Sequence, residues 1–234
     1  MQCVILAAGL GTRMGGLTEQ VPKPLLEVAG KTFLEHKFDI LPDDVDEILL
    51  VVGHLGDKVR ERYGEEYKGK RILYVEQGEL NGTADALWKT QHLLNGKFLV
   101  LMGDDIYARE DIDSCRKYDW ALLAKYNPDM RQGGKLIKDE AGNLADIVEG
   151  TEHDGPGLIS TNMFVLDTRL FQYHQMVPKG PGSHEFGLPQ TVLAASRASG
   201  IPLAIVEATL WIQITSVEDL KNAESVLLGS STPK

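Results

Sequence analysis

The stretch that decides the fold is Val4-Ile5-Leu6-Ala7-Ala8-Gly9-Leu10-Gly11-Thr12-Arg13-Met14, with Val-Pro-Lys-Pro-Leu following from position 21. Its first residues are apolar and are typical of a buried β-strand. The side chains then become very small, because alanine or glycine occupies positions 7, 8, 9 and 11. Small residues let a backbone turn sharply, aim successive N–H groups in one direction and approach a ligand closely. The stretch therefore predicts a strand that ends in a loop of bare backbone.

Two cations, Arg13 and Lys23, accompany this loop. Both side chains donate charge-assisted hydrogen bonds to anionic oxygens. Two other glycine motifs do not fit, since no Gly-Lys-Ser/Thr follows Gly9 and Met14 occupies the last glycine position of a dinucleotide fingerprint. A tight turn with solvated cations is the alternative, and the glycines alone would fit it equally well. With the Pro-Lys-Pro segment at this spacing, the loop predicts a cradle for a nucleoside triphosphate.

Length and composition narrow the class of protein. The chain has 234 residues, of which 43% are hydrophobic, and its formal net charge is −10. This length suits a single α/β domain, and the apolar content supports a sizeable core. A strongly acidic chain is a poor candidate for nucleic-acid binding, which needs a basic face. The cationic cradle would instead focus an anionic small molecule within an acidic protein.

The cysteines and the lengths of the apolar runs predict the cellular location of the protein. Cys3 falls on the first strand and Cys115 on an expected helix, so we expect no disulfide, and free thiols fit a reducing environment. No apolar run approaches the roughly 18 residues that span a bilayer. The first residues also lack the basic start of a signal peptide. We therefore expect no membrane partner and a cytoplasmic location.

Strands and helices alternate along the first half of the chain. We expect strands at 4–6, 47–53, 71–75 and 97–102, and helices at 32–41, 57–63 and 82–94, the first of them opened by a Thr-x-x-Glu capping box. This alternation predicts a doubly wound, mostly parallel sheet of the Rossmann-like type. Ligands bind such sheets at the carboxyl ends of the strands. The cradle, Gln77 and Asp104 all follow such an end.

The second half is richer in strands. We expect strands at 120–124, 135–137, 144–148, 157–166, 202–206 and 211–215, and helices at 168–174, 188–199 and 216–228. No linker separates the halves, so we expect one domain over 1–228. Residues 1–118 would form its nucleotide-binding half, 119–228 a β-rich half for the acceptor, and 229–234 a tail.

Asp104 is the candidate metal ligand. It follows the fourth strand beside the cradle, and a carboxylate there suits Mg²⁺, a hard cation that prefers oxygen. The alternative is a turn aspartate that bonds its own backbone.

The motif L-A-A-G-x-G-T-R-M followed by P-K-P-L resembles the signature of the sugar-1-phosphate nucleotidyltransferases, and the likeness continues through 82–84, 103–104 and 211–220. The resemblance implies transfer of a nucleotidyl group from a nucleoside triphosphate to a sugar 1-phosphate, with release of pyrophosphate. Such enzymes frequently form homo-oligomers. The catalytic candidates are Arg13, Lys23 and Asp104. The nucleotide-binding candidates are Leu6, Ala7, Ala8, Gly9, Gly11, Thr12, Arg13, Lys23, Gln77, Gly82 and Thr83.

The resemblance places Gln77 and Gly82-Thr83 at the nucleobase. A primary amide can offer a donor and an acceptor side by side, which matches the imide edge of uracil or thymine. Two structural alternatives stay open. Thr83 is equally well explained as a helix N-cap, and Gln77 as an exposed residue at a strand end.

For the acceptor sugar, the resemblance points to Gly134, Glu149, Ser160 and Asn162. The usual sugar-binding Asn falls on Ser160, while Asn162 takes a position that is commonly Gly, so either side chain could make the contact. Glu149 could equally be a surface carboxylate, and Glu185 is a further candidate. The lysine that often follows this glutamate is missing, so the charge that neutralises the sugar phosphate must come from elsewhere.

Gln213 is the main departure from the family pattern. It stands where the second metal-binding Asp or Asn is expected in W-x-D-I-G-T-P-E-D-L. Its amide oxygen can bind Mg²⁺ but supplies no charge. Two alternatives therefore stay open: a catalytically weak module that binds a nucleotide or nucleotide sugar and regulates a partner, and a cytidylyltransferase acting on a phosphorylated alcohol.

Overall fold

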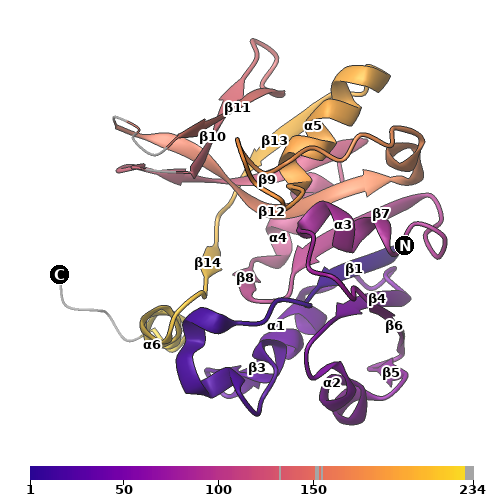
Figure 1. Ribbon diagram of the computed structural model, residues 1–234, viewed down its shortest axis with the longest axis vertical. Coiled ribbons are helices and arrows are strands. Elements are labelled where there is room, and N and C mark those ends of the chain that lie inside the picture. Colours follow the sequence, from indigo (N-terminus) through magenta and orange to yellow (C-terminus); the bar gives the residue numbers. More distant parts are fainter. Residues whose placement is uncertain (132, 151–152, 154, 230–234) are drawn as a thin grey trace.

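In the computed structural model, which describes residues 1–131, 133–150, 153 and 155–229, one large sheet runs through the chain (Figure 1). Its centre is four parallel strands in the order β7 (Lys97–Met102), β1 (Gln2–Leu6), β4 (Glu47–Val52) and β6 (Lys70–Glu76). β1 and most of β4 and β7 are buried, as expected for apolar strands with helices on both faces. The predicted doubly wound, mostly parallel fold class is confirmed.

The strand order reverses beside β1. The chain passes from β1 to β4 and β6 on one side, and then returns to β7 on the other side of β1. A doubly wound sheet opens a crevice at the carboxyl ends of the strands at such a point. The loop of small residues leaves β1 there.

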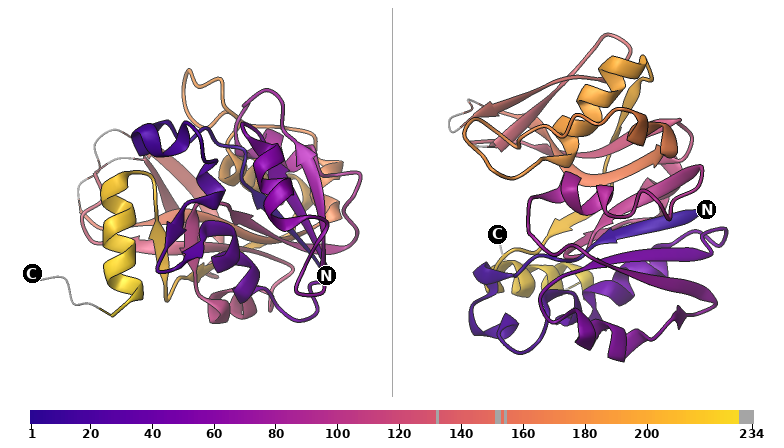
Figure 2. Two further views of the ribbon diagram at one scale, coloured as in Figure 1. Left: turned by 90° about the horizontal axis from the view of Figure 1, so that it is seen from below. Right: turned by 45° about the vertical axis from the view of Figure 1, so that its right-hand side comes forward.

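The second half extends the same sheet with antiparallel strands. β12 (Gly157–Asp167) pairs with β7, and it also pairs with β9 (Trp120–Asn127) and β10 (Gly133–Lys138). β11 (Leu144–Gly150) pairs with β10, while β13 (Leu203–Glu207) runs parallel to β9. Figure 2 shows this half stacked against the first half. The predicted strand-rich character of the second half is confirmed.

Helices cover both faces of the sheet. α3 (Thr83–Trp88) and α5 (Leu188–Ser199) pack on one face, and α1 (Phe33–Ile40), α2 (Gly56–Tyr63) and α4 (Arg109–Cys115) on the other. α1 begins with the predicted capping box, in which Thr32 and Glu35 each accept a backbone N–H from the other. This pattern satisfies otherwise unpaired N–H groups of the first turn.

The end of the chain returns to its beginning. β14 (Trp211–Gln213) pairs with β8 (Asp105–Tyr107), and α6 (Val217–Leu227) then packs against η1 (Thr12–Thr18) and the hairpin of β2 (Glu27–Val28) and β3 (Lys31–Thr32) (Figure 1). The short elements η2 (Lys23–Leu25), β5 (Glu66–Tyr67) and η3 (Thr168–Gln172) complete the fold.

Several predicted boundaries are wrong, and the strand expected over 120–124 continues to Asn127. The helix expected over 82–94 ends at Trp88, because the Thr90 hydroxyl donates a hydrogen bond to the Leu87 carbonyl at 2.7 Å, and this bond favours a turn. The helix expected over 168–174 is a 3₁₀ helix that ends at Gln172. The strand expected over 211–215 ends at Gln213. Of the expected tail, only Gly229 lies within the described residues.

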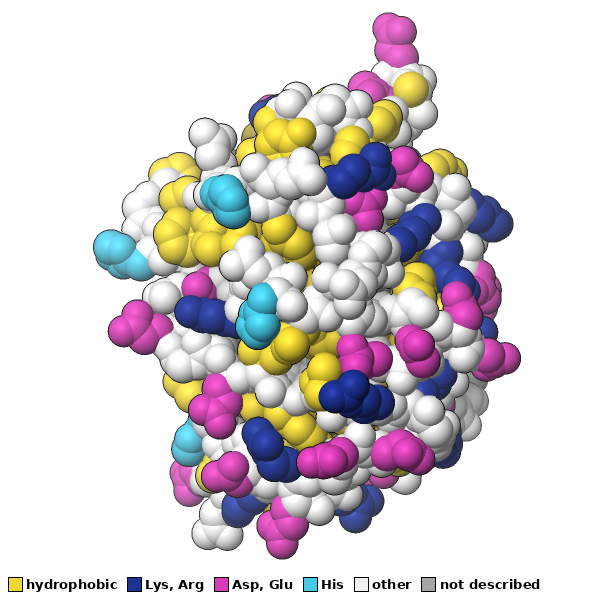
Figure 3. All heavy atoms as spheres, turned by 90° about the vertical axis from the view of Figure 1, so that its right-hand side faces the viewer, with side chains coloured by type: hydrophobic (Ala, Val, Ile, Leu, Met, Phe, Trp, Pro, Cys, Tyr) yellow, Lys and Arg dark blue, Asp and Glu magenta, His cyan; other side chains and the backbone are white. Residues whose placement is uncertain are grey.

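Cys3 and Cys115 are buried and unpaired, as predicted. Burial raises the pKa of the Cys115 thiol to about 12. Within the described chain, no helix combines the length and apolar composition that crossing a bilayer requires. On the face drawn in Figure 3, basic and acidic side chains are interspersed.

Candidate active site

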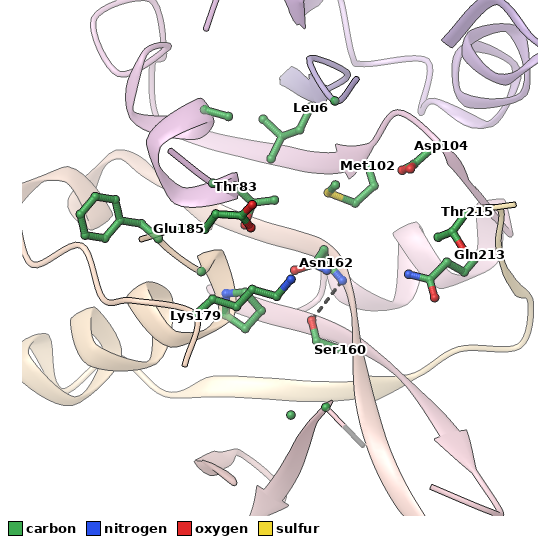
Figure 4. Close-up of a pocket in the computed structure, with 18 of the residues that line it drawn as sticks. Leu6, Thr83, Met102, Asp104, Ser160, Asn162, Lys179, Glu185, Gln213 and Thr215 are labelled. Atoms are coloured by element: carbon green, nitrogen blue, oxygen red, sulfur yellow. Dashed lines mark hydrogen bonds between the residues drawn. The ribbon is translucent and has the colours of Figure 1, made fainter. Parts of the chain in front are cut away.

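A cavity of about 600 Å³ opens at the carboxyl ends of β1, β6 and β7 and reaches across to the second half (Figure 4). This volume is typical of small-molecule sites. The cavity brings together every predicted site residue except Ala7, namely Leu6, Ala8, Gly9, Gly11, Thr12, Arg13, Lys23, Gln77, Gly82, Thr83, Asp104, Gly134, Glu149, Ser160, Asn162, Glu185 and Gln213. Ala7 does not line the cavity. Its N–H bonds Val51, and a side chain on Gly103 would collide with its methyl group.

The loop after β1 is held in a shape that only glycine fits at position 11. Gly11 has a φ of 66°, and a Cβ there would lie 2.9 Å from Thr18 and 3.2 Å from Lys23. The Thr18 hydroxyl donates to the Gly11 carbonyl at 3.0 Å. The loop is thereby packed against the stem of Lys23, while Arg13 lines the cavity from an exposed position.

Lys23 and Asp104 meet at the centre of the site. The Lys23 ammonium lies 2.5 Å from a carboxylate oxygen of Asp104, although the two residues are 81 positions apart in the chain. Lys23 is only 7% exposed, so water screens this ion pair weakly. At this point of the cavity, Lys23 could bind an anionic ligand and Asp104 could bind a cation.

The end of the cavity where we expect the nucleobase differs in part from the prediction. Gln77 is buried, which rules out the exposed-residue alternative, and its amide nitrogen donates to the Gly82 carbonyl at 3.0 Å and to Asp85 at 3.4 Å. Both donors are therefore engaged, so Gln77 offers a ligand its carbonyl oxygen rather than a donor–acceptor pair. The N-cap of α3 is Gly82, not Thr83. The Thr83 hydroxyl instead accepts the N–H of Leu188 at 3.0 Å.

Gly82 lies in close contact with the second half of the chain. Its φ is 103°, and a Cβ there would lie 2.4 Å from the Phe186 carbonyl oxygen. Backbone hydrogen bonds join Phe186 to Asn81 at 2.7 Å and Ala84 to Phe186 at 3.1 Å. The start of α3 is thus bonded directly to the segment that precedes α5.

Where we expect the acceptor, a bulge in β12 places Asn162 and Ser160 in the cavity wall. Asn162 has a φ of 55°, which is the left-handed conformation. Glycine suits such a position, and asparagine also tolerates it well. The Asn162 N–H donates to the Ser160 hydroxyl at 3.0 Å (Figure 4). The Ser160 oxygen is therefore partly engaged by the backbone, whereas the side-chain amide of Asn162 is directed into the cavity.

Glu149 is an exposed residue of the cavity wall, and a neighbouring side chain binds its carboxylate. Gln190 donates to its carboxylate at 2.7 Å and to the Lys179 carbonyl at 3.1 Å. The side chain of Lys179 extends toward Asn162 (Figure 4). Lys179 thus brings a cation to this end of the cavity, where the sequence had left the source of positive charge open.

Sequence reasoning missed Lys179, Gln190 and Trp211 as parts of the cavity wall. Lys179 and Gln190 lie in or just after a loop without a recognisable motif, so no local signal could have found them. Trp211 belongs to the closing motif, and its indole N–H donates to Asp105 at 2.9 Å. Gln213 lies two residues further along β14 and also lines the cavity.

A cradle of bare backbone with a buried lysine, at the switch point of a doubly wound sheet, defines a nucleotide-binding α/β protein. The nucleotidyl transferase family model matches residues 2–225. The chain therefore belongs to the nucleotidyl transferase family and is an enzyme of nucleotidyltransferase type.

Relatives of known name agree with this membership. The chain is 29% identical to the UTP–glucose-1-phosphate uridylyltransferase AglF of Haloferax volcanii, over 99% of this chain and 98% of that protein. It is 31% identical to the bifunctional protein GlmU of Methanocaldococcus jannaschii over 74% of this chain, but the match spans only 41% of GlmU. A solved structure of a candidate glucose-1-phosphate thymidylyltransferase from Bacillus anthracis shares the fold, with a TM-score of 0.82, 22% identity and coverage of 100% and 98% of the two chains.

Proposed function

We propose that this protein transfers a nucleotidyl group from a nucleoside triphosphate to a sugar 1-phosphate, which forms a nucleotide sugar and releases pyrophosphate. The observation that carries the proposal is the ion pair of Lys23 and Asp104 beside the bare backbone after β1. An acceptor phosphate oxygen would attack the α-phosphorus in line, and the bond to the β-phosphate oxygen would break. The protein contributes positioning and charge stabilisation rather than bonds of its own.

In this proposal the two cations bind different phosphates of the triphosphate. Lys23, buried at the centre of the cavity, neutralises the α-phosphate and the incoming phosphate. Arg13, on the rim, holds the β- and γ-phosphates that leave. Arginine suits the leaving group because its planar fork binds phosphate oxygens in pairs.

Magnesium is the cofactor that this site would take. Asp104 and Gln213 line the cavity with a carboxylate and an amide oxygen, which are donors that a hard cation accepts. Among the described residues no group of three or more His, Cys, Asp or Glu could hold an ion alone. Substrate phosphates would therefore complete the coordination, as is common for Mg²⁺. When bound, the ion would supply positive charge to the reacting phosphates.

The acceptor would lie between the second-half strands and the loop before α5. Glu149, fixed by Gln190, and the amide of Asn162 offer hydrogen bonds to sugar hydroxyls, and Ser160 and Gly134 complete this wall. Lys179 supplies the cation for the sugar phosphate that the missing family lysine would otherwise provide.

A pyrophosphate-release assay tests the proposal. We would combine UTP, dTTP, GTP and CTP with several sugar 1-phosphates and with phosphocholine as a phosphorylated alcohol, in the presence of Mg²⁺. We expect turnover with a sugar 1-phosphate, and a loss of about 10²- to 10³-fold in kcat for Lys23→Ala, by analogy with loss of one transition-state donor. Near-normal turnover of Lys23→Ala would contradict the assigned roles. Binding without pyrophosphate release would favour a regulatory module, and activity confined to CTP and phosphocholine would favour a cytidylyltransferase.

A further inference from the structure

Gln190 is a residue of the cavity wall whose amide has a one-sided set of contacts. It lies in the first turn of α5 and is half-buried. Its amide nitrogen donates to the Glu149 carboxylate at 2.7 Å and to the Lys179 carbonyl at 3.1 Å. Its amide oxygen is buried, and within the described part of the chain it has no hydrogen-bond partner. A buried acceptor without a partner lowers stability and therefore calls for an explanation.

The two partners of Gln190 determine which way its amide points. A carboxylate and a backbone carbonyl only accept hydrogen bonds, so the amide nitrogen must face them and the amide oxygen must face away. Turning the amide over would place its oxygen against both acceptors and would lose both bonds. The oxygen stays without a partner because both donors are directed toward Glu149 and Lys179.

Two glycines leave the space that this contact needs. A Cβ on Gly187, the residue before α5, would lie 2.0 Å from the Gln190 amide oxygen and 3.1 Å from the Lys179 Cα. A Cβ on Gly134 would lie 2.6 Å from a carboxylate oxygen of Glu149, its partner in the β10–β11 ladder. Neither glycine has a positive φ. The contact therefore depends on the missing side chains and not on an unusual backbone conformation.

Glu149 and Lys179 would hold different groups of the acceptor in the proposed function. Glu149 offers its oxygens to hydroxyl groups, and Lys179 offers a cation to a phosphate. The first lies on β11 and the second in the loop before α5, and both line the cavity. Both residues are exposed, so packing alone does not fix the distance between them. Gln190 bonds the side chain of one and the backbone of the other.

We propose that Gln190 is a positioning residue for the acceptor: its amide sets the spacing between Glu149 and Lys179, so that a sugar 1-phosphate binds through a hydroxyl group and its phosphate at once. The inference rests on the proposed function, because that function assigns the acceptor to this part of the cavity. Two binding groups held at the right spacing bind a ligand more tightly, since less freedom is lost on binding. Gln190 thereby raises the affinity for the acceptor without touching the reacting atoms.

Gln190→Met tests the inference, because it removes both donors and keeps an unbranched side chain of similar length. We expect the KM for the sugar 1-phosphate to rise about tenfold, the size expected for loss of a hydrogen bond to a charged group. The KM for the nucleoside triphosphate should be unchanged, and kcat should change far less than the acceptor KM, because the lost contact serves ground-state binding. The thermal midpoint should stay or rise, since the buried oxygen without a partner is removed as well.

Gly187→Ala is a second variant that disturbs the same contact and leaves Gln190 in the chain. The added methyl group would meet the end of a flexible side chain, so the amide must move while the backbone keeps an ordinary conformation. We expect the acceptor KM to rise as in Gln190→Met. Gly180→Ala is the matched control, because Gly180 follows Lys179 in the same loop and an added Cβ there has nothing within 4 Å. This control should keep the wild-type KM for both substrates.

The outcomes separate this inference from the proposed function. If the wild type releases pyrophosphate and a folded Gln190→Met keeps its KM for the sugar 1-phosphate, the inference is wrong and the proposed function stands. A lower thermal midpoint with an unchanged acceptor KM would assign Gln190 to the fold alone. If Gln190→Met does not fold, the acceptor KM of Gly187→Ala decides in the same way. If the wild type releases no pyrophosphate with any substrate pair, the proposed function fails and the inference fails with it.

Discussion

At position 213 a neutral amide stands where a second carboxylate would give a metal site its charge. Gln213 lines the cavity, and Asp104, a carboxylate that lines it from the first half of the chain, is paired with Lys23. The charge at the centre of the site is therefore balanced before any substrate binds. An incoming triphosphate would have to separate the pair, with Lys23 turning to phosphate and Asp104 becoming free for a cation. We expect the affinity for Mg²⁺ to be limited by this single carboxylate.

Gln213→Asp tests that expectation. The added charge should lower the Mg²⁺ concentration for half-maximal pyrophosphate release by a factor on the order of ten, because ligand charge sets the affinity of such sites. A magnesium titration of initial rates measures the change. Gln213→Asn is the control, since it shortens the side chain without adding charge. An unchanged magnesium dependence in Gln213→Asp would show that position 213 does not contact the ion.

Asn162→Gly tests which side chain of the β12 bulge contacts the acceptor. Its positive φ makes glycine free of strain there, so the fold should be unaffected. Loss of one hydrogen bond worth about 1 kcal/mol should raise the KM for the sugar 1-phosphate roughly fivefold and leave that for the triphosphate unchanged. Ser160→Ala should have little effect. If Ser160→Ala instead raised the KM for the sugar 1-phosphate, the contact with the sugar would belong to Ser160, as the family pattern implies.

Among the helices, α3 hydrogen-bonds directly to the second half of the chain. It is only Thr83–Trp88, and its first turn bonds Phe186 and Leu188 in the second half. Gly82 permits this because its backbone approaches Phe186 more closely than any side chain would allow. Gln77 packs under the same turn through its bond to the Gly82 carbonyl. The base end of the cavity therefore depends on one glycine at a helix start.

Gly82→Ala should destabilise the protein by about 2–4 kcal/mol, from backbone strain and the collision with Phe186 together. Urea unfolding followed by circular dichroism measures the loss. Gly78→Ala is the control, because Gly78 lies in the same loop with a φ of 71° but has nothing within 4 Å of the added Cβ. Equal losses in the two variants would mean that backbone strain, rather than the contact between the halves, dominates.

For the whole molecule, the cavity lies where the two halves face each other across one sheet. β12 hydrogen-bonds to β7 and so continues the nucleotide-binding sheet into the second half. A ligand in the cavity would contact residues from both halves at once. Binding should therefore stabilise both halves together. If the chain is one domain, as predicted, the two halves should unfold in a single cooperative transition.

We expect a single thermal unfolding transition that moves as a whole with ligand. A nucleotide sugar or nucleoside triphosphate at 100 times its Kd should add about 2.7 kcal/mol of stability. Differential scanning calorimetry with and without ligand measures both quantities, and Lys23→Ala should lose most of the shift. Two separate transitions, with only one responding to ligand, would contradict the single-domain prediction.

The sequence by itself determined the alternation of strands and helices, the loop after β1 and the capping box of α1. These features depend on local chemistry: small residues, apolar runs and side chains that bond their own backbone. Local patterns also indicated Arg13, Lys23 and Asp104 as a group, because parallel strands end at one edge of a sheet.

Only the tertiary structure decided what those groups meet. It paired Lys23 with Asp104, placed Lys179 in the cavity wall and engaged both donors of Gln77. No spacing in the sequence encodes these contacts, because they join segments whose distance is set by strand order and by packing between the halves. Local chemistry therefore fixes the elements of this protein, while their assembly fixes which charges and hydrogen-bonding groups remain available to a substrate.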